Sequence, residues 1–534
     1  MSNTPLSRPL KDFLTPAIAE KAGILEINGN DAVSVSGLEF DSRSVKEGYL
    51  FFALTGLHTD GHNYIGDAVK RGASVIVYER EPDERLDGIA YLRAENSRFA
   101  MSAISDAFYD HPSRCMAIIG VTGTEGKSTT VYLIYQLLKL IGKKTGFIST
   151  VSQSDGKNEW WNSEHQTTPE APIVHRLLAD MRQNGVEFAV VESSSHGLSK
   201  KTNRLGDVDF DIAVLTNLHH EHLEFHGTWE QYRYDKAELF RALDLAVSSH
   251  RKKCPSGEKT IPCFAVSNAD DKSTPYFAAA TKRKTYTFST NGAIADISLK
   301  IIESSSGGNW YEAAVASSGK THTIRDQLPG AFNAANVLAS LLVVSNLLSK
   351  DIEELVPLVQ QLKPVRGRMN TINRGQNFEV LVDYAHTPSS FEAILPPLRE
   401  RLDSAAAGGE SGKQRRLICL FGSPGERDTQ KRRLQGEIAA RYSDIVVLTD
   451  EDPRGEDPMT ILEEIASACG EKIRGETLFL IPDRPTAIRK AFSLAQSGDT
   501  VLLLGKGHEN SIIYADKTID YDEIAEAEKA LDEL

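Results

Sequence analysis

Short apolar runs alternate with helical stretches along most of the chain. Residues 188–191 and 212–215 are apolar at every position and lie between helical stretches, which is typical of strands in a parallel sheet. The last third of the chain repeats this pattern at residues 379–383, 417–421 and 501–504. The pattern therefore predicts an α/β fold with a central parallel sheet of the P-loop type and a C-terminal Rossmann-like, doubly wound sheet.

The length of the chain indicates several domains, because 534 residues are too many for one hydrophobic core. The first part has strand candidates at 49–54 and 74–78 around a helical segment, and it lacks the G-x-G-x-x-G pattern of dinucleotide-binding domains. The polar segment 246–262 predicts an irregular surface excursion. We expect three domains, at residues 1–112, 113–364 and 365–534.

Composition narrows the class of protein. Hydrophobic residues make up 40% and charged residues 25%, as in ordinary soluble proteins, and the formal charge of -14 argues against a basic face for nucleic acid. Five cysteines without C-x-x-C spacing indicate neither a zinc site nor a disulfide framework. The sequence has no signal segment and no apolar run near the roughly 20 residues that span a bilayer. We expect a cytoplasmic monomer without membrane insertion.

Residues 120–130, with the sequence G-V-T-G-T-E-G-K-S-T-T, lie between an apolar run and a helical stretch. Backbone N–H groups freed by Gly123 and Gly126 can point at phosphate oxygens, and a helix N-terminus favours an anion. Lys127 adds a positive charge, and Ser128 offers a hydroxyl to Mg²⁺. The stretch predicts a nucleoside-triphosphate site; the alternative, a glycine-rich turn with a solvated lysine, does not explain the apolar strand before it.

Polar residues follow both central strands. Glu192-Ser-Ser-Ser-His196 comes after the first, and a histidine-rich segment, 216–226, comes after the second. Ligands bind at the carboxyl ends of parallel strands, so a carboxylate and an imidazole there are candidate metal ligands. The segment does not form the H-E-x-x-H of a zinc protease, and an exposed polar loop is the simpler alternative for some of its histidines.

Lys236 falls on the apolar stripe of a helical stretch at residues 228–243, with Tyr232 and Phe240 on the same face. Burying an unpaired ammonium costs several kcal/mol, as a rough guide, or forces the amine to be neutral. A neutral amine can capture CO₂ as a carbamate, which is an anionic metal ligand. The alternatives are that Lys236 reaches solvent or pairs with Asp235 or Glu238.

These motifs, in this order, resemble those of the Mur ligase family over nearly the whole chain. The phosphate loop is similar to the family's T-G-T-x-G-K-[ST]-T, and residues 232–240 are similar to its Y-x-x-x-K-x-x-L-F helix. The resemblance implies that His222 binds Mg²⁺ with Ser128, Glu192 and a carbamate on Lys236. It also implies that Lys127, Lys236, His222 and Glu192 form the catalytic set.

The resemblance assigns the other site residues in three groups. For ATP it implies Gly123, Thr124, Gly126, Lys127, Ser128, Thr129, Asn333, Asn336, Arg368, Asp383 and His386. For a uridine-nucleotide sugar-peptide it implies Ser42, Arg43, His58, Thr59, Thr167, Thr168, Ser194, Ser195 and Arg204; without the family, the first four are ordinary turn chemistry. For the incoming amino acid it implies Arg427, Asp452, Arg454, Gly505 and Glu509.

The resemblance is strongest to the members that add a diamino acid to UDP-N-acetylmuramoyl-L-alanyl-D-glutamate. It implies an ATP-dependent ligase that uses two Mg²⁺ ions, forms an acyl phosphate and closes its C-terminal domain during the cycle. The amino acid can be meso-diaminopimelate, L-lysine or L-ornithine. Asp452 replaces the asparagine of the family's D-N-P-R motif. The negative charge of Asp452 favours the ammonium group of a substrate, whereas Arg454 favours a carboxylate. The alternatives are a ligase that adds D-alanyl-D-alanine and a P-loop NTPase without ligase activity.

Overall fold

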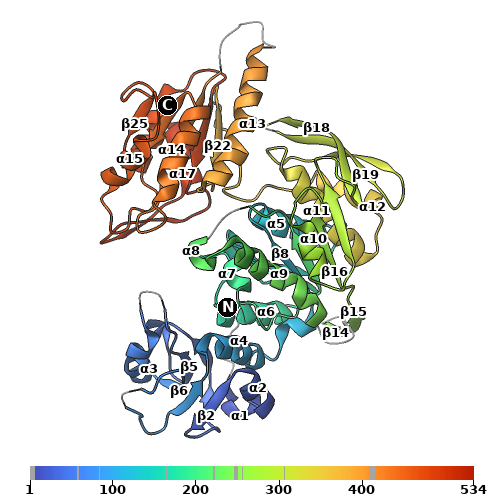
Figure 1. Cartoon of the computed structure of the whole chain (residues 1–534), viewed down its shortest axis with the longest axis vertical. Helices are drawn as coiled ribbons and strands as arrows, with labels where there is room; N and C mark the ends of the chain where they lie inside the picture. The colour runs from blue at the N-terminus through green and yellow to red at the C-terminus, as the bar shows by residue number, and fades with distance from the viewer. Residues whose placement is uncertain are drawn as a thin grey trace. The chain divides into compact units, whose positions relative to one another are not determined.

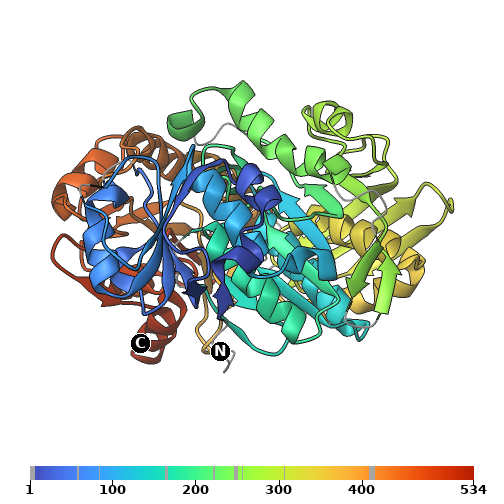
Figure 2. The same ribbon diagram turned by 90° about the horizontal axis from the view of Figure 1, so that it is seen from below.

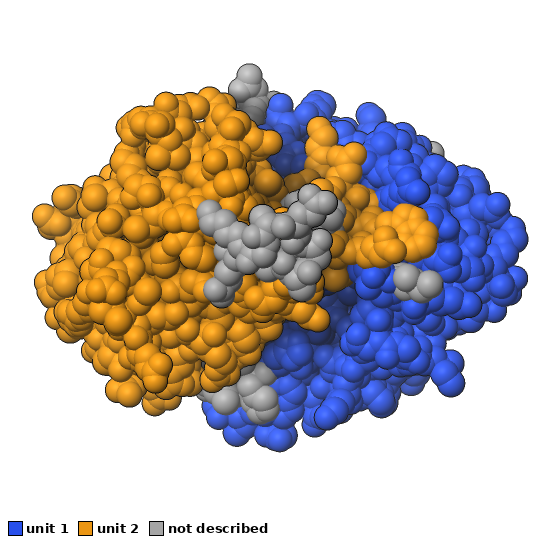
Figure 3. Space-filling view, turned by 90° about the horizontal axis from the view of Figure 1, so that it is seen from above, with its two compact units in different colours: residues 1–302, 311–325, 332–362 blue, residues 303–310, 326–331, 363–534 orange. Residues whose placement is uncertain are grey.

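The computed structural model describes residues 7–56, 59–82, 84–162, 166–219, 223–245, 251–254, 257–305, 307–407 and 415–534 (Figures 1 and 2). The chain divides into two compact units, which Figure 3 shows in different colours. The first unit holds residues 1–302, 311–325 and 332–362, and the second holds residues 303–310, 326–331 and 363–534.

A five-stranded sheet lies at the start of the first unit. Its order is β2 (Ile24–Asn28), β7 (Ala90–Ala94), β6 (Ala73–Tyr78), β5 (Tyr49–Phe52) and β4 (Gly37–Glu39). The strands β4 to β7 are parallel, and β2 runs antiparallel to β7. The other elements are β1 (Arg8–Pro9), paired with β3 (Ser34–Val35), η1 (Ser42–Ser44), η2 (Gly61–Tyr64), α1 (Leu10–Phe13), α2 (Pro16–Lys21), α3 (Ile65–Lys70) and α4 (Ser97–Phe108).

Alternate side chains of these parallel strands face two hydrophobic cores. Leu50 and Val75 pack with α1 and α4, whereas Phe51 and Ile76 pack with α3. Successive side chains of a strand point to opposite faces, so the alternation follows from strand geometry. Because β4 and β5 are parallel, the segments that follow them leave the sheet at the same edge.

An eleven-stranded sheet follows. Its order is β11 (Glu159–Trp161), β10 (Ser152–Ser154), β9 (Thr145–Ile148), β12 (Phe188–Glu192), β8 (Ala117–Thr122), β13 (Ile212–Leu215), β16 (Phe264–Asn268), β17 (Thr285–Ser289), β18 (Ile297–Ser305), β19 (Gly308–Val315) and β20 (Thr321–Arg325). The six strands from β9 to β17 in this order are parallel. The ends of β8, β9, β12 and β13 therefore meet at one edge.

Helices surround this sheet and complete its cores. They are η3 (Pro112–Cys115), α5 (Lys127–Leu140), α6 (Ala171–Gln183), α7 (Ser195–Leu198), α8 (Leu223–His226), α9 (Trp229–Leu245), α10 (Thr274–Ala279), α11 (Asn333–Leu348) and α12 (Ile352–Val359). Side chains of α6, α9 and α10 share one core with β8 and β13, and α5 packs against α11. This packing fixes α9, and with it Lys236, beside the sheet.

A hairpin replaces part of the segment that we expected to be irregular. Strands β14 (Arg251–Cys254) and β15 (Gly257–Thr260) pair antiparallel, and residues 246–250 and 255–256 lie outside the described residues. Lys252 is buried, and its Nζ donates to Asp211 Oδ2 at 2.6 Å and to the carbonyl oxygens of Ser113 and Asp209. The expectation of a fully irregular segment was wrong because these long-range contacts stabilise a short hairpin.

The second unit contains a six-stranded sheet. Its order is β21 (Asn370–Ile372), β22 (Glu379–Asp383), β26 (Thr500–Leu504), β23 (Leu417–Phe421), β24 (Ile445–Leu448) and β25 (Leu478–Leu480), and only β21 is antiparallel. One face packs with α13 (Pro388–Ala407), α14 (Gln430–Tyr442) and α15 (Pro458–Ala466), and the other packs with α16 (Arg484–Leu494) and α17 (Glu523–Asp532). A hairpin of β27 (Ser511–Ile513) and β28 (Thr518–Asp520) precedes α17.

Helices on both faces of a mostly parallel sheet are the defining arrangement of a doubly wound fold. The predicted fold class is therefore confirmed. The strand that precedes the phosphate loop, β8, lies within a parallel sheet, and a Rossmann-like sheet forms the C-terminal part of the chain. Among the described residues, no helix is both long and apolar enough to cross a membrane.

Candidate active site

The glycine-rich segment joins β8 to α5 as a phosphate loop. Gly123 and Gly126 have φ values of 148° and 81°, in the range that favours glycine. A Cβ on Gly126 would lie 2.6 Å from Asn336 Oδ1, so no other residue fits there without displacing that asparagine. Lys127 begins α5, and its Nζ donates to the carbonyl oxygen of Thr124 at 2.7 Å. The loop has the backbone and the lysine that a triphosphate site requires.

Residues after β13 fix the shape of this loop. The Asn217 side chain accepts from the backbone N–H of Glu125 at 2.8 Å and donates to the Glu125 carbonyl at 3.2 Å. The hydroxyl of Thr216 donates to the same carbonyl at 2.6 Å. Sequence analysis did not select either residue, although both lie directly after a predicted strand, which was the available signal.

Glu192 ends β12 and is nearly fully buried. Its carboxylate accepts hydrogen bonds from the hydroxyls of Ser128 at 3.0 Å, Ser149 at 2.7 Å and Thr150 at 2.9 Å, and from the Thr150 backbone N–H at 2.9 Å. Ser149 and Thr150 follow β9, and sequence analysis missed them. A hydroxyl and a carboxylate oxygen beside the phosphate loop are hard ligands of the kind that Mg²⁺ takes in proteins.

Lys236 is buried, as its place on the apolar stripe predicted, with 2% of its surface exposed. Its Nζ donates to the Gly123 carbonyl at 2.6 Å and lies 4.8 Å from the centroid of the Tyr232 ring. Asp235 pairs with His226 at 2.7 Å and Glu238 pairs with Arg241 at 2.8 Å. The two carboxylates considered as alternative partners of Lys236 are therefore bonded elsewhere.

The remaining metal candidate, His222, lies outside the described residues. Within the described part of the chain, no group of three or more His, Cys, Asp or Glu side chains could hold a metal ion by itself. Ser128 and Glu192 are in contact with each other, and Lys236 contacts the same loop. These oxygen donors are chemically suited to Mg²⁺, which in nucleotide-binding proteins also takes ligands from the phosphates of ATP.

Three residues assigned to the sugar-peptide lie together beside Glu192. The Thr168 hydroxyl donates to the Glu192 carbonyl at 2.8 Å and accepts from the backbone N–H and the hydroxyl of Ser194, each at 3.0 Å. Arg204 donates to the Thr168 carbonyl at 2.8 Å and pairs with Glu170 at 2.9 Å. Thr167 lies beside Thr168 in sequence, and Ser195 begins α7.

Glu170 links this group to the N-terminal sheet. Arg98 of α4 lies 3.5 Å from its second carboxylate oxygen.

At the edge of the N-terminal sheet, Ser42 and Arg43 form η1 after β4, and Thr59 lies in the segment after β5. Arg43 pairs with Asp41 at 2.7 Å and is largely exposed; His58 lies outside the described residues. The two segments leave parallel strands at one edge, as a single binding surface would require.

Asn333 and Asn336 begin α11 and are both buried. Asn336 accepts from the Thr130 hydroxyl at 3.1 Å and donates to Asn333 at 2.9 Å, so both are tied to the start of α5.

In the second unit, the residues assigned to ATP lie at the end of β22. Asp383 accepts from the backbone N–H of Met369 and Ala385, and burial raises its pKa. His386 contacts the Tyr384 carbonyl at 2.9 Å, and Arg368 lies over the Tyr384 ring.

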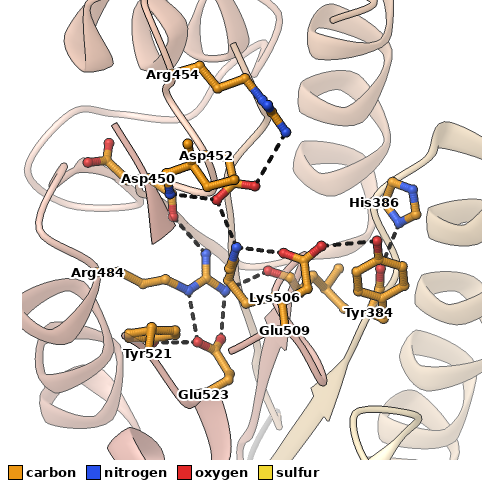
Figure 4. A network of polar contacts seen from close by, with 12 residues as sticks. Tyr384, His386, Asp450, Asp452, Arg454, Arg484, Lys506, Glu509, Tyr521 and Glu523 are labelled. Atoms are coloured by element: carbon orange, nitrogen blue, oxygen red, sulfur yellow. Dashed lines mark hydrogen bonds and ion pairs between the residues drawn. The ribbon is translucent and has the colours of Figure 1, made fainter. Parts of the chain in front are cut away.

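The residues assigned to the amino acid lie mainly at the carboxyl edge of the second sheet, after β24 and β26. A buried lysine, Lys506, joins them: its Nζ lies 2.9 Å from Asp452 and 2.5 Å from Glu509 (Figure 4). Tyr384 donates to the other oxygen of Glu509 at 3.2 Å, and Arg454 lies 3.9 Å from Asp452. Burial lowers the pKa of Lys506, but the charges of Glu509 and Asp452 outweigh it and raise the pKa overall.

Sequence analysis missed Lys506, and that omission changes the interpretation of Asp452. Asp452 Oδ1 also accepts from the Ile513 backbone N–H at 3.0 Å. Its negative charge is thus already compensated within the protein, and it is less available to an incoming ammonium than the sequence suggested. Arg427 is exposed and lies on the loop after β23. That loop is held next to Asp452, because the backbone N–H of Gly425 donates to the Asp452 carbonyl at 2.8 Å.

Two buried arginines hold the loops of this site. Arg432 donates to the Pro424 carbonyl at 3.1 Å and pairs with Glu456 at 2.9 Å, which connects the loops after β23 and β24. Arg484 donates to the carbonyls of Asp450 at 3.0 Å and Leu504 at 2.7 Å, which connects the ends of β24 and β26 (Figure 4). Nothing in the local sequence marks either arginine as buried, because charged residues at helical positions are usually solvated.

The chain carries a phosphate loop on one parallel sheet, and a doubly wound sheet with polar residues at its carboxyl edge follows. These features define the class: a multidomain P-loop nucleotide-binding protein with an α/β fold. The comparisons with known proteins define the family. The chain belongs to the Mur ligase family: it matches the Mur ligase middle domain at residues 121–344, the Mur ligase glutamate ligase domain at 367–507 and the Mur ligase family catalytic domain at 34–109.

Relatives and solved structures agree with this assignment. The UDP-N-acetylmuramyl-tripeptide synthetase of Treponema denticola is 50% identical over 97% of this chain and 98% of its own length. The UDP-N-acetylmuramoyl-L-alanyl-D-glutamate–2,6-diaminopimelate ligase of Geobacillus kaustophilus is 37% identical over 93% of this chain and 95% of its own. A solved structure of a ligase with that name superposes with a TM-score of 0.61 and 27% identity, over 99% of both chains.

Proposed function

We propose that this protein is an ATP-dependent ligase that adds a diamino acid to the D-glutamate of UDP-N-acetylmuramoyl-L-alanyl-D-glutamate in peptidoglycan precursor synthesis. The names of the relatives matched along nearly the whole chain support this substrate. The observation that carries the proposal is the contact of Ser128 with Glu192 directly behind the phosphate loop, with the Thr168 and Arg204 pair alongside. This arrangement can place a phosphoryl donor next to the carboxylate of a bound peptide.

The chemistry follows from the low reactivity of a carboxylate toward amines. One oxygen of the substrate carboxylate attacks the γ-phosphorus of ATP, ADP leaves, and an acyl phosphate forms. The neutral amine of the amino acid then attacks the acyl carbon, inorganic phosphate leaves, and the amine loses a proton. Lys127 and the backbone N–H groups of the loop stabilise the charge that builds up on the transferred phosphoryl group.

We assign a pair of Mg²⁺ ions to Ser128, Glu192, His222 and a carbamate on Lys236. When bound, the ions would neutralise phosphate charge and so assist the transfer of the phosphoryl group. Ser149 and Thr150 orient the Glu192 carboxylate through their hydrogen bonds, so they are positioning residues. Lys236 is buried and its Nζ contacts the Gly123 carbonyl, so a carbamate on it would lie beside the phosphate loop.

The other assignments follow the three groups of residues. Asn333, Asn336, Arg368, Asp383 and His386 contribute to ATP binding. Ser42, Arg43, His58, Thr59, Thr167, Thr168, Ser194, Ser195 and Arg204 bind the uridine-nucleotide sugar-peptide. Arg427, Asp452, Arg454, Gly505 and Glu509 receive the amino acid. We further propose that the enzyme acts as a cytoplasmic monomer, which size-exclusion chromatography with light scattering would test.

The decisive experiment measures phosphate release from ATP with and without UDP-N-acetylmuramoyl-L-alanyl-D-glutamate and with meso-diaminopimelate, L-lysine or L-ornithine. We expect release only when the UDP-dipeptide and one amino acid are both present. Lys127→Ala should abolish release, whereas Lys157→Ala, an exposed lysine of the same unit, should not. Release that ignores both substrates would indicate an NTPase, and release only with UDP-tripeptide and D-alanyl-D-alanine would indicate the other ligase.

A further inference from the structure

A buried polar cluster lies where the N-terminal sheet meets the eleven-stranded sheet of the first unit. Helix α4 follows β7 of the N-terminal sheet, α6 belongs to the larger sheet, and the two helices pack against each other (Figure 1). The side chain of His175 on α6 is completely buried, and that of Asp106 on α4 is 3% exposed. The proposed mechanism uses neither residue.

The hydrogen bonds of this cluster are incomplete. His175 Nδ1 lies 3.5 Å from Asp106 Oδ1, and neither atom has a hydrogen-bond partner among the described residues. His175 Nε2 also lacks a partner there. The second oxygen of Asp106 contacts His111 Nδ1 at 2.6 Å. Because a neutral imidazole always carries one N–H, a buried donor stays unpaired here, which is rare in proteins and costs free energy.

Two further polar contacts connect the same helices near their ends. Arg98 at the start of α4 lies 3.5 Å from Glu170, which precedes α6. Arg182 near the end of α6 donates to the Asp110 carbonyl at 2.8 Å. Both arginines are partly exposed. Helices α4 and α6 thus form one joint, the α4–α6 joint, with partly exposed contacts at its ends and the buried cluster between them.

This joint connects the two groups of residues assigned to the sugar-peptide. One group, which includes η1, lies at the edge of the N-terminal sheet. The other includes Thr168 and directly precedes α6, which begins at Ala171. Glu170, the last residue before α6, pairs with Arg204 of this second group at 2.9 Å. A ligand that contacts both groups therefore binds tightly only while the joint is closed.

We propose that the α4–α6 joint is an acid-sensitive device, which stays closed while His175 is neutral and opens when His175 takes up a proton. In the opened joint water solvates the imidazolium, whereas the closed joint offers its ring nitrogens no hydrogen bond. The inference rests on the proposed function for its consequence alone, which is that acid weakens the binding of the UDP-dipeptide.

The charged groups around His175 do not offset its burial. Burial lowers the pKa of His175; Asp106 and Asp207 act against this, and Lys21 and His111 act with it. Both carboxylates already have other partners, since Asp106 contacts His111 and Asp207 pairs with Lys21 at the end of α2. A proton on His175 would therefore be a buried charge that these groups compensate incompletely.

The Asp106 carboxylate stays ionised where a histidine titrates. Burial raises the pKa of Asp106, but the hydrogen bond with His111 and the charges of His175, His111 and Arg114 outweigh burial and lower the pKa overall. Asp106 thus carries the same charge in the closed and the opened joint over this range, and the difference in bound protons between the two states lies on His175.

The direction of the pH effect follows from this difference. The closed joint holds the pKa of His175 below its ordinary value of 6.5, so the closed joint binds fewer protons than the opened one. The joint is most stable above that value and loses stability as the pH falls below it. For one proton the ratio of closed to open joint falls by about tenfold per pH unit.

The test measures hydrogen exchange of the full chain by mass spectrometry from about pH 5 to about pH 8, the range in which histidines titrate, with correction for the chemical exchange rate. Peptides of α4 and α6 report the joint, and peptides of α15 in the second unit are the internal reference. The variants are His175→Leu, which cannot take up a proton, and, as a matched control, His111→Asn, which removes the other histidine that contacts Asp106. Calorimetric titration with the UDP-dipeptide at the same pH values measures the consequence for binding.

We expect the wild-type protection of α4 and α6 to be constant above about pH 6.5 and to fall by about tenfold per pH unit below it, with no such change in α15. His175→Leu should remove this slope and keep the protection at about pH 8, because an apolar group replaces an unpaired polar one. His111→Asn should keep the slope. The Kd of the UDP-dipeptide should rise more steeply toward acid pH in the wild type than in His175→Leu.

Other outcomes separate this inference from the proposed function. Equal slopes in the wild type and His175→Leu would overturn the acid-sensitive joint, and so would a slope that only His111→Asn removes. Identical Kd profiles in the wild type and His175→Leu would overturn its consequence for binding. No binding of the UDP-dipeptide at any pH would refute the proposed function, and the exchange data would still decide the joint. If His175→Leu does not fold, the wild type decides, because protection that stays constant below about pH 6.5 overturns the inference.

Discussion

Replacing Arg484 by methionine tests how the amino-acid edge of the second unit is held together. Arg484 and Glu523 are both completely buried, and two guanidinium nitrogens meet the carboxylate at 2.8 and 2.6 Å. The same guanidinium donates to the carbonyls of Asp450 and Leu504. Arg484→Met keeps much of the side-chain volume but leaves a buried carboxylate with the hydroxyl of Tyr521 and without a counter-ion.

The size of the effect follows from this burial. Removing one partner of a buried ion pair costs about 3–5 kcal/mol, because the other charge stays buried and uncompensated. For a unit of this size each kcal/mol lowers the melting temperature by about 2–4 °C, so the loss corresponds to roughly 6–20 °C. The affinity for the amino acid should also fall, since the ends of β24 and β26 lose their common donor.

Calorimetry of the full chain measures the melting temperature, and hydrogen exchange read by mass spectrometry locates the loss in β24, β26 and α17. Arg489→Met is the matched control, because Arg489 lies on the same helix and its ion pairs with Glu526 and Glu533 are partly exposed. We expect a much smaller loss there. The double variant Arg484→Met with Glu523→Gln should recover more than half of the loss, since the buried charge is gone.

Two results would refute this reasoning. If Arg484→Met melts within the range of Arg489→Met, the buried pair does not stabilise the edge. If the double variant is no more stable than Arg484→Met alone, the uncompensated carboxylate is not the cause of the loss, and the missing donors to the two carbonyls are the better explanation.

Three further predictions concern the reaction. Lys236→Ala should abolish phosphate release, with partial return when a short carboxylic acid is supplied in place of the carbamate; a fully active variant would remove this role. Gly126→Ala should weaken ATP binding in calorimetric titration, because the new Cβ meets Asn336 at 2.6 Å and the backbone is at φ +81°; unchanged affinity would contradict the tight packing of the loop. Asp452→Asn leaves Lys506 with one carboxylate partner instead of two, so preference should shift toward meso-diaminopimelate and its second carboxylate; an unchanged ranking of the amino acids would show that this charge does not select them.

Much of the fold could be predicted because its signals are local. The apolar runs at β12, β13, β23 and β26 fall within a residue or so of the observed strands, and the phosphate loop lies where strand, glycines and helix meet. The burial of Lys236 followed from helical periodicity alone, since residues four apart share one face. The segment at 251–260 was missed as a hairpin, because its strands are short and polar and depend on a buried lysine.

The sequence by itself determined the class of fold, the phosphate loop and the residues that follow each strand of the two large sheets. Only the tertiary structure decided which of those residues meet. Glu192 receives its hydrogen bonds from Ser128 and from residues 149–150, and Asp452 is neutralised by Lys506, 54 residues away in the chain. In a parallel sheet, crossover helices bring the ends of distant strands to one edge, so the partners of a buried charge depend on strand order and register, which no local pattern contains.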